Sequence, residues 1–154
     1  MKLSSNQKAY LAGFLDGDGS IYVRAKPNQT YRFGYQIAPY IVFYQSSKSD
    51  LFRNIYSLIG FGHVRMRSDG VTEFIISKHD NIIEFINTIK PFLILKQKQA
   101  ELLIRILKQK ESVKNINDFG KLLQLCNQFQ FLNYSKGRKI RIAPVETKRR
   151  SSKY

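Results

Sequence analysis

Two aspartates, Asp16 and Asp18, flank a single glycine in the stretch LAGFLDGDG of residues 11–19. The apolar residues before them predict a short helix that ends at these glycines, so both carboxylates would lie at its carboxyl end. The helix macrodipole disfavours an anion there by a few tenths to about 1 kcal/mol. A divalent cation offsets that cost. The Asp18 carboxylate and the Gly17 carbonyl are hard oxygen ligands that suit Mg²⁺, whose remaining positions are left to water and phosphate.

Spacing alone leaves two interpretations of the acidic pair open. An EF-hand calcium loop is excluded, because the sixth position counted from Asp16 is Ile21 instead of glycine and the twelfth is Pro27 instead of glutamate. What remains is either a metal-binding helix end or an ordinary turn in which Asp and Gly take their usual structural roles.

The helix before the acidic pair carries small residues, Ala12, Gly13 and Gly17, that leave one side nearly smooth. Glycine inside a helix costs about 1 kcal/mol relative to alanine, so a packing reason is expected. Small residues let two helix backbones approach closely. If this helix pairs with its copy in a second subunit, the two acidic ends are brought side by side.

The chain is strongly basic. Its 154 residues include 26 Lys and Arg against 11 Asp and Glu, a net charge of +15, which indicates a polyanionic partner. One cysteine and two histidines exclude an intrachain disulfide and a structural zinc site of the Cys/His kind. No apolar run approaches the roughly 20 residues of a membrane span, and the N-terminus lacks a signal-peptide core, so we expect no membrane partner.

Hydrophobic periodicity predicts two strand hairpins that alternate with helices. The expected elements are a helix over 7–15 that starts at Ser4 or Ser5, strands over 20–26 and 31–45 around a turn at 27–29, a helix over 51–59 whose start lies in 47–50, strands over 63–67 and 73–77 around a turn at 68–70, and helices over 80–91, 96–110 and 118–134. This order predicts an α+β fold, a mixed αββαββα core with a curved antiparallel sheet and further helices toward the C-terminus. We expect one domain over 1–140 and a basic, mobile tail over 141–154.

The strand pattern separates an apolar face from a basic and aromatic one. The second face carries Arg24, Lys26, Arg32, Gln36, Arg65 and Arg67, with Tyr22, Tyr40, Tyr44 and His63 among them. Arg and Lys bind phosphates or guanine edges and Gln pairs with adenine in a major groove, so the pattern favours a β-ribbon that recognises DNA. Two alternatives stay open: an ordinary solvated face, and RNA binding by base stacking, which typically uses aromatic residues clustered in mid-strand.

Residues 11–19 resemble the LAGLIDADG motif of homing endonucleases, and the likeness extends beyond that motif. The segments KPNQ at 26–29, PFL at 91–93, LKQKQA at 95–100 and SKGRK at 135–139 are similar, in order and spacing, to segments of the single-motif, group I intron endonucleases of algal organelles. The resemblance covers the chain to about residue 140.

The resemblance implies a metal-dependent active site made of few residues. The implied metal ligands are Asp18 and Gly17, and the implied catalytic residues are Asp18, Gln45, Lys96 and Lys48. The metal is Mg²⁺, with Mn²⁺ or Ca²⁺ able to occupy the same site. Gln45 would orient water and Lys96 would lie near the phosphate. The family usually has a second basic residue four positions after the glutamine, where this chain has Ser49, and Lys48 is the candidate substitute.

The resemblance also implies a homodimer on double-stranded DNA, with a saddle-shaped sheet of each subunit in a major groove. The expected interface residues are Leu11, Ala12, Gly13, Phe14 and Asp16, the last of which would serve the turn and the interface. The expected DNA-binding residues are Tyr22, Arg24, Lys26, Asn28, Thr30, Tyr31, Arg32, Gln36, Ala38, Tyr40, Val42, Tyr44, His63, Arg65, Arg67, Glu73, Ile75, Lys136, Arg138 and Lys139. No small-molecule substrate is implied.

The implied activity is hydrolysis of both strands at a long pseudo-palindromic site, which leaves 3′ overhangs and promotes intron mobility. The alternative is a non-cleaving relative that acts as an RNA splicing maturase or a DNA-binding regulator. A histidine-dependent nuclease is disfavoured, because His63 falls on a sheet face and His79 at a helix start. Cys126 lies on an apolar stripe and is expected in the core. The implied location is an organelle, with the chloroplast favoured over the mitochondrion.

Overall fold

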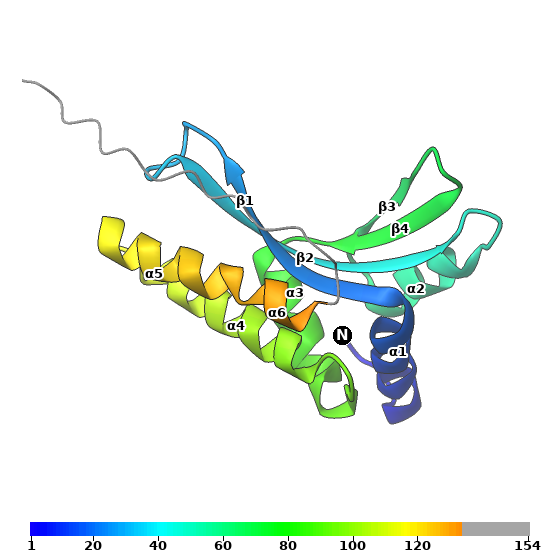
Figure 1. The fold of residues 1–154 in the computed structure, drawn as a ribbon. Helices are drawn as coiled ribbons and strands as arrows, with labels where there is room; N and C mark the ends of the chain where they lie inside the picture. The colour runs from blue at the N-terminus through cyan, green and yellow to red at the C-terminus, as the bar shows by residue number, and fades with distance from the viewer. Residues whose placement is uncertain (134–154) are drawn as a thin grey trace, which may run out of the picture.

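The computed structural model describes residues 1–133, which form a curved four-stranded antiparallel sheet with helices on one of its faces (Figure 1). The elements, in chain order, are α1 (Ser5–Asp18), β1 (Gly19–Pro27), β2 (Tyr35–Ser46), α2 (Leu51–Ile59), β3 (His63–Met66), β4 (Val71–Ile76), α3 (His79–Ile89), the 3-10 turn η1 (Lys90–Phe92), α4 (Gln97–Glu111), α5 (Ile116–Asn127) and α6 (Phe129–Leu132). The predicted αββαββα order and the α+β class are therefore confirmed. Within the described residues, no helix is long and apolar enough to cross a bilayer.

The sheet order, β1-β2-β4-β3, reflects an internal repeat. Each αββ unit contributes one hairpin, and the second strands of the two hairpins pair in the middle of the sheet. The sheet bends so that its uncovered face is concave, while every helix lies on the convex side (Figure 1). The hairpin tips rise at the two ends of this concave face.

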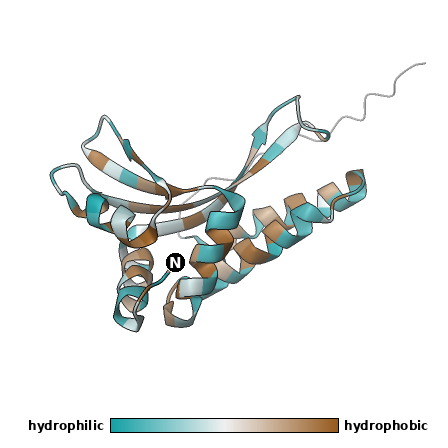
Figure 2. Cartoon of the chain, turned by 180° about the vertical axis from the view of Figure 1, so that it is seen from behind, coloured by the Kyte–Doolittle hydropathy of each residue, from teal (hydrophilic) through white to brown (hydrophobic). Residues whose placement is uncertain are grey.

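The core lies between the convex side of the sheet and the helices. Its largest fully buried side chains are Phe43, Phe74, Phe85, Leu11, Leu15, Ile21, Ile41, Ile55, Ile76, Ile82, Ile86 and Ile89. Seen from behind, the helices turn their hydrophobic sides toward the sheet and toward one another (Figure 2). Burial of this apolar surface holds α1 firmly beneath the sheet.

Helix α1 begins as predicted but extends past its predicted end. Ser4 is the N-cap, and its side chain forms a reciprocal capping box with Gln7. The helix continues through both aspartates to Asp18, because Leu15 and Asp16 are buried against the rest of the protomer and those contacts outweigh the low helix propensity of glycine. The chain then enters β1 at Gly19, where an added Cβ would lie 2.5 Å from a Leu15 methyl carbon, so only glycine fits this tight transition.

The predicted strand over 31–45 begins too early, since β2 starts at Tyr35. Residues 28–34 form a turn in which the Asn28 amide donates to the Gly34 carbonyl at 2.8 Å. Gly34 has a φ of 75°, a left-handed conformation that a strand does not contain. Arg32 therefore lies in the hairpin turn, and Phe33 stacks on Phe119 of α5 with ring centroids 5.0 Å apart.

The predicted helices beyond the second hairpin differ from the observed ones at their ends. Helix α3 stops at Ile89 and continues as η1 through Pro91, and the single helix predicted over 118–134 is two helices that meet at Gln128. The break lets Phe129 enter the core while Phe131 stays exposed. The expected tail over 141–154, the predicted domain boundary at 140, and Lys136, Arg138 and Lys139 lie outside the described residues.

Candidate active site

The carboxyl end of α1 presents oxygen atoms to solvent. Asp18 and Gly17 are exposed, and none of the salt bridges within residues 1–133 involves Asp18. The last carbonyls of a helix lack intrahelical partners, so the Gly17 carbonyl lies beside a free carboxylate at the negative end of the macrodipole. This donor set suits a hard divalent cation.

Asp16 behaves differently from its neighbour, and its role within the protomer was missed by the sequence analysis. The side chain is 9% exposed. Its Oδ2 accepts hydrogen bonds from the amides of Ile94 and Leu95 at 2.7 and 3.1 Å, and its Oδ1 accepts one from the amide of Lys96 at 2.9 Å. Asp16 thus binds the segment before α4, 78 to 80 positions further along the chain. No local pattern in the sequence predicts a contact of that range.

Lys96 lies beside the carboxyl end of α1, near Asp18. We call this region, made up of Asp16, Gly17, Asp18 and Lys96, the α1 corner. Its ammonium donates to the main-chain carbonyl of Asp16, one of the free carbonyls at the end of α1. Burial lowers the pKa of Lys96, and the negative charges of Asp16 and Asp18 lie close enough to oppose that shift. The structure therefore brings together two of the predicted catalytic residues, which are far apart in sequence.

The register of the sheet places Gln45 two residues beyond the partner of Gly19, the first residue after α1. Gly19, the residue after α1, pairs with Phe43, so β2 continues two residues further, alongside the end of α1. Gln45 shares the helix-covered side of the sheet with Phe43, since alternate residues of a strand face the same way. Its Oε1 accepts a hydrogen bond from the Ser46 amide at 3.0 Å.

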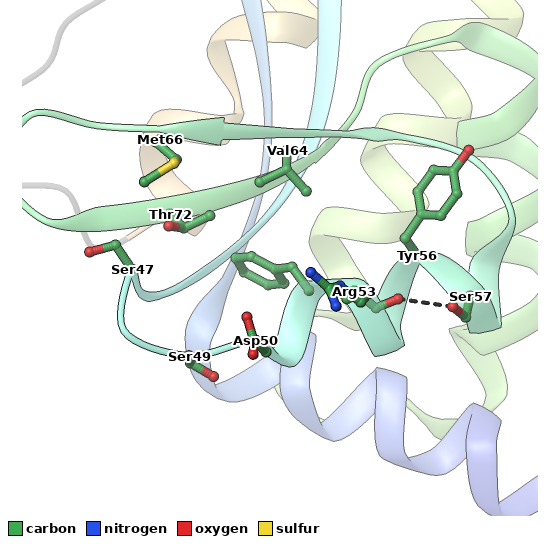
Figure 3. A pocket seen from close by; sticks show the side chains of 10 residues that line it. Ser47, Ser49, Asp50, Arg53, Tyr56, Ser57, Val64, Met66 and Thr72 are labelled. Carbon is green, nitrogen blue, oxygen red and sulfur yellow. Dashed lines mark hydrogen bonds between the residues drawn. The ribbon is translucent and has the colours of Figure 1, made fainter.

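Lys48 lies in an exposed turn before α2. The turn is fixed by hydrogen bonds from the Ser49 amide to the Ser46 carbonyl and from the Leu51 amide to the Ser49 hydroxyl. Helix α2 starts at Leu51, one residue after the predicted start region ends. The turn also borders a hollow between α2 and the β3–β4 hairpin, lined by Ser47, Phe52, Tyr56, Val64 and Met66 among others (Figure 3).

The concave face carries the side chains that strand alternation predicted. Tyr22 pairs with Tyr40 and Lys26 with Gln36, while across the middle of the sheet Tyr44 pairs with Glu73. His63 and Arg65 continue the same face on β3, opposite Ile75 and Glu73. Ala38 and Val42 also belong to this face, where neighbouring side chains bury them. Of the predicted set on residues 1–133, Asn28, Thr30, Tyr31 and Arg32 lie in the turn at the tip of the β1–β2 hairpin.

Aromatic rings hold the cations of β1 in place. Tyr22 and Tyr40 stack with centroids 5.2 Å apart, and the Arg24 guanidinium lies 5.2 Å above the first ring and 5.9 Å from the second. Lys26 donates to the Tyr40 hydroxyl. Such cation–π contacts order long side chains without neutralising them. Burial raises the pKa of Tyr22, against the favourable effect of the Arg24 charge on its ionised form.

Glu73 is a buried carboxylate in the middle of this basic face. Its side chain is 6% exposed and accepts a hydrogen bond from Arg65 Nε at 2.7 Å, with Arg67 Nη1 at 3.4 Å. Arg67 is also paired with Asp69 at the hairpin tip. Glu73 is also among the residues predicted to bind DNA, and within the protomer its carboxylate binds these two arginines.

One open hollow joins the α1 corner to the concave face. It is lined by Asp16 and Lys96 on the helix side and by Tyr22, Tyr44, Arg65 and Glu73 on the sheet, among others. Asn133, the last described residue, also lines it and donates to the Ile21 carbonyl at 3.1 Å. A polyanion bound on the sheet would therefore extend directly over the end of α1.

The residues predicted for a dimer interface divide into two groups. Leu11 and Ala12 are fully buried within the protomer, and Phe14 packs against Phe43 at 5.0 Å between ring centroids. Gly13 is exposed, with no atom within 4 Å of a Cβ placed on it. The smooth exposed ridge of α1 is instead Ala9, Gly13 and Gly17, one turn apart, with Tyr10 beside it.

Two exposed apolar side chains lie next to the end of this ridge. Ile94 and Leu95 are 83% and 71% exposed, and their amides are bound by Asp16 of α1. Large apolar side chains at such exposure beside a small-residue ridge are typical of a protein–protein contact surface.

The histidines and the cysteine lie away from the acidic corner. His63 is exposed on β3, and His79 starts α3, where its Nδ1 and Nε2 lie 3.6 and 3.4 Å from Asp80 and Glu111. Cys126 is fully buried, as expected, and burial raises its pKa to about 12. Residues 1–133 contain no cluster of three or more His, Cys, Asp or Glu side chains that could hold a metal.

The chain is similar to known DNA endonucleases over most of its length. DNA endonuclease I-CreI of Chlamydomonas reinhardtii is 41% identical over 134 residues, which cover 84% of this chain and 80% of that protein. DNA endonuclease I-CvuI of Chlorella vulgaris is 29% identical over 133 residues, 86% of this chain and 83% of that protein.

Solved structures agree with this likeness. I-CvuI in complex with its target in the presence of 2 mM Ca superposes with a TM-score of 0.82 at 29% identity, covering 88% of this chain and 87% of that one. I-CvuI in complex with the I-CreI target, uncleaved in 2 mM Mg, gives 0.81 at 28% identity over 87% and 86%. The family model described as LAGLIDADG endonuclease matches residues 11–106. The chain therefore belongs to the LAGLIDADG endonuclease family.

Proposed function

We propose that this protein is a metal-dependent homing endonuclease that binds double-stranded DNA as a homodimer and cuts both strands at one long site. The observation that carries the proposal is a hollow that runs from the concave, basic sheet face to Asp16 and Lys96 at the end of α1, where the exposed Asp18 carboxylate follows Asp16 by two residues. I-CvuI, which shares the fold, has been solved on DNA in the presence of Mg and of Ca. A two-fold dimer supplies one such corner to each strand of the duplex.

Asp18 and the Gly17 carbonyl are proposed to hold Mg²⁺, with ligands from DNA phosphate and from the partner protomer completing the site. When bound, the cation supplies a Lewis acid on the phosphate. The residues of the chain perform the remaining tasks: Gln45 orients water at the end of β2, and the Lys96 ammonium offers positive charge to the phosphate and the leaving oxygen. Lys48 is proposed to add the second positive charge that Ser49 does not supply.

Homodimer formation is proposed to bury the ridge of Ala9, Gly13 and Gly17 against its copy. Close approach of two such ridges brings the Asp18 carboxylates of both protomers toward one axis. The exposed side chains of Ile94 and Leu95 would then be buried at the flank of the same contact. Two carboxylates close together repel each other, and a bound cation would offset that repulsion.

The DNA is proposed to lie along the concave face, with side chains of β1 to β4 in the major groove. Strand side chains on this face alternate between cations and rings, which suits phosphate and base contacts together. The basic residues Lys136, Arg138 and Lys139 follow Asn133 by three to six positions, and Asn133 is bound to β1 at Ile21. We assign them to DNA backbone contacts and place the functional domain at residues 1–140.

Three finer features belong to the same proposal. Mg²⁺ is the physiological ion, the cut leaves 3′ overhangs, and the break promotes mobility of a group I intron that encodes the protein. The relatives from Chlamydomonas and Chlorella support an organellar origin, and we assign the chloroplast. The alternative, a non-cleaving maturase or regulator, requires no free carboxylate beside the DNA-binding face.

Cleavage of a DNA library separates these functions. The purified protein is incubated with plasmids that carry randomised or intron-insertion sequences, in Mg²⁺ and in EDTA. The proposal expects double-strand cuts at one sequence in Mg²⁺ only. Absence of cutting, combined with tight binding to the host intron RNA, would establish the maturase instead.

A further inference from the structure

The start of α4 lacks a side-chain cap of its own. Lys96 occupies the N-cap position with φ −105° and ψ 20° and makes no capping hydrogen bond with its side chain. The amides of three consecutive residues, Ile94, Leu95 and Lys96, are instead bound by the carboxylate of Asp16. Asp16 of α1 thus binds the N-cap amide of α4 and the two amides before it, and ties the segment that leads into α4 to the end of α1.

Asp16 holds Lys96 at two points. One carboxylate oxygen accepts the Lys96 amide at 2.9 Å, and the main-chain oxygen of Asp16 accepts the Lys96 ammonium. The first contact fixes the Lys96 backbone, and the second fixes the far end of its side chain. A lysine side chain free in solvent samples many rotamers, so this double contact selects the one that lies along the end of α1.

Asp16 is suited to hold other groups of the chain in place and not to take part in the reaction itself. It is nine-tenths buried, and its carboxylate oxygens already accept three hydrogen bonds. Asp18, two residues later, is exposed and free of salt bridges within the described part of the chain. The two aspartates of the motif therefore carry different tasks.

We propose that Asp16 is a positioning residue for catalysis: from α1 it binds the segment that leads into α4 and thereby fixes the Lys96 ammonium beside Asp18. This inference rests on the proposed endonuclease function. The physical gain is preorganisation, since a cation already aimed at the phosphate needs no reorganisation during reaction. A displacement of about 1 Å in such a group costs up to 10²-fold in rate.

The test is Asp16→Asn, which keeps the size of the side chain. Asparagine has one carbonyl oxygen and presents an NH₂ group where the other oxygen stood, so at least one of the three amides loses its acceptor. We expect the single-turnover cleavage rate in Mg²⁺ to fall about 10- to 100-fold. DNA affinity in Ca²⁺ should stay within about twofold, because Asp16 is buried and its carboxylate is bound to main-chain amides of its own chain. Asp80→Asn, the same change at a 97% exposed side chain on α3, is the matched control and should cleave like wild type.

A double-mutant cycle separates positioning from general structural damage. If Asp16 acts through Lys96, then Asp16→Asn should cost no more than about twofold in a Lys96→Ala background. The inference would be overturned if Asp16→Asn lowered the cleavage rate by the same factor in the Lys96→Ala background as in wild type. A wild-type cleavage rate in Asp16→Asn alone would also overturn it. If Asp16→Asn does not fold, Asp16→Glu, which keeps both oxygens one methylene further out, enters the same cycle with the same criterion. If the wild-type protein cuts no DNA, the proposed function is contradicted and this inference with it. If the wild-type protein cuts DNA and the variants cut equally fast, only the inference is contradicted.

Discussion

Glu73→Gln removes a negative charge from the centre of the concave face. It is expected to lower the stability of the fold and to strengthen non-specific DNA binding. The carboxylate is 6% exposed and binds Arg65, whose side chain is 60% exposed. A charge-assisted hydrogen bond of this kind contributes about 1.5–3 kcal/mol, and the exposure of Arg65 reduces that through solvent screening. Because glutamine keeps one acceptor, we expect the free energy of unfolding to fall by about 1–2 kcal/mol.

The same substitution is expected to strengthen non-specific DNA binding. Arg65 and Arg67 lose the carboxylate that neutralises them and become available to phosphates. Each additional phosphate contact steepens the slope of log affinity against log salt by about 0.9. Affinity for an unrelated duplex should therefore rise several-fold at low salt, while discrimination between target and non-target DNA should decrease.

Urea unfolding and fluorescence anisotropy across a salt series measure the two effects. Asp69→Asn is the matched control: it removes one negative charge from the same hairpin, but at a half-exposed side chain that forms a salt bridge with Arg67 and accepts the Val71 amide. It should destabilise the protein less than Glu73→Gln does. Unchanged stability together with an unchanged salt slope in Glu73→Gln would refute the assignment of Glu73 as the residue that organises these arginines.

Two further substitutions and one labelling experiment test other features of the structure. Gly13→Leu should leave the protomer folded, because a Cβ there meets no atom within 4 Å and leucine favours helix, while sedimentation shows loss of the dimer; a stable dimer would place the interface elsewhere. Arg24→Ala should relax base preference at one position of each half-site, seen by competition binding against single-base variants; equal preference in both proteins would remove Arg24 from base recognition. Cys126, with its pKa raised to about 12 by burial, should resist thiol reagents at pH 8 until the protein unfolds. Its contribution to stability is present below pH 9 and lost as the pH rises from about 9 toward 12; rapid labelling of the native protein would contradict its place in the core.

Local patterns in the sequence were sufficient to predict the helices and strands and the side of the sheet that each strand residue faces. Alternation along β1 and β2 placed Tyr22 and Gln36 on the concave face, and the register confirms it. The Ser4 start of α1 followed from its capping residues. The early start predicted for β2 failed because Gly34 has a left-handed φ within a hydrogen-bonded turn and Phe33 packs on Phe119. The unbroken helix predicted over 118–134 failed because Phe129 packs into the core.

The active-site corner depends on contacts that no window of sequence contains. Residue spacing indicated the metal-binding end of α1, and resemblance indicated Gln45 and Lys96, but only the fold places Lys96 beside α1. The contacts of Asp16 span about half of the chain, and the burial of Glu73 depends on side chains from neighbouring strands. Such long-range polar contacts have no periodic signature, so propensity and alternation do not predict them.

The most direct test of the central claim is to compare Asp18→Asn with wild type on the same target DNA in Mg²⁺. The Asp18 side chain is exposed, so the substitution removes a charge without disturbing the fold. We expect the cleavage rate to fall by at least about 10³-fold, while DNA affinity in Ca²⁺ and the dimeric state are retained. Cleavage by Asp18→Asn at a rate near that of wild type would remove Asp18 from the catalytic role.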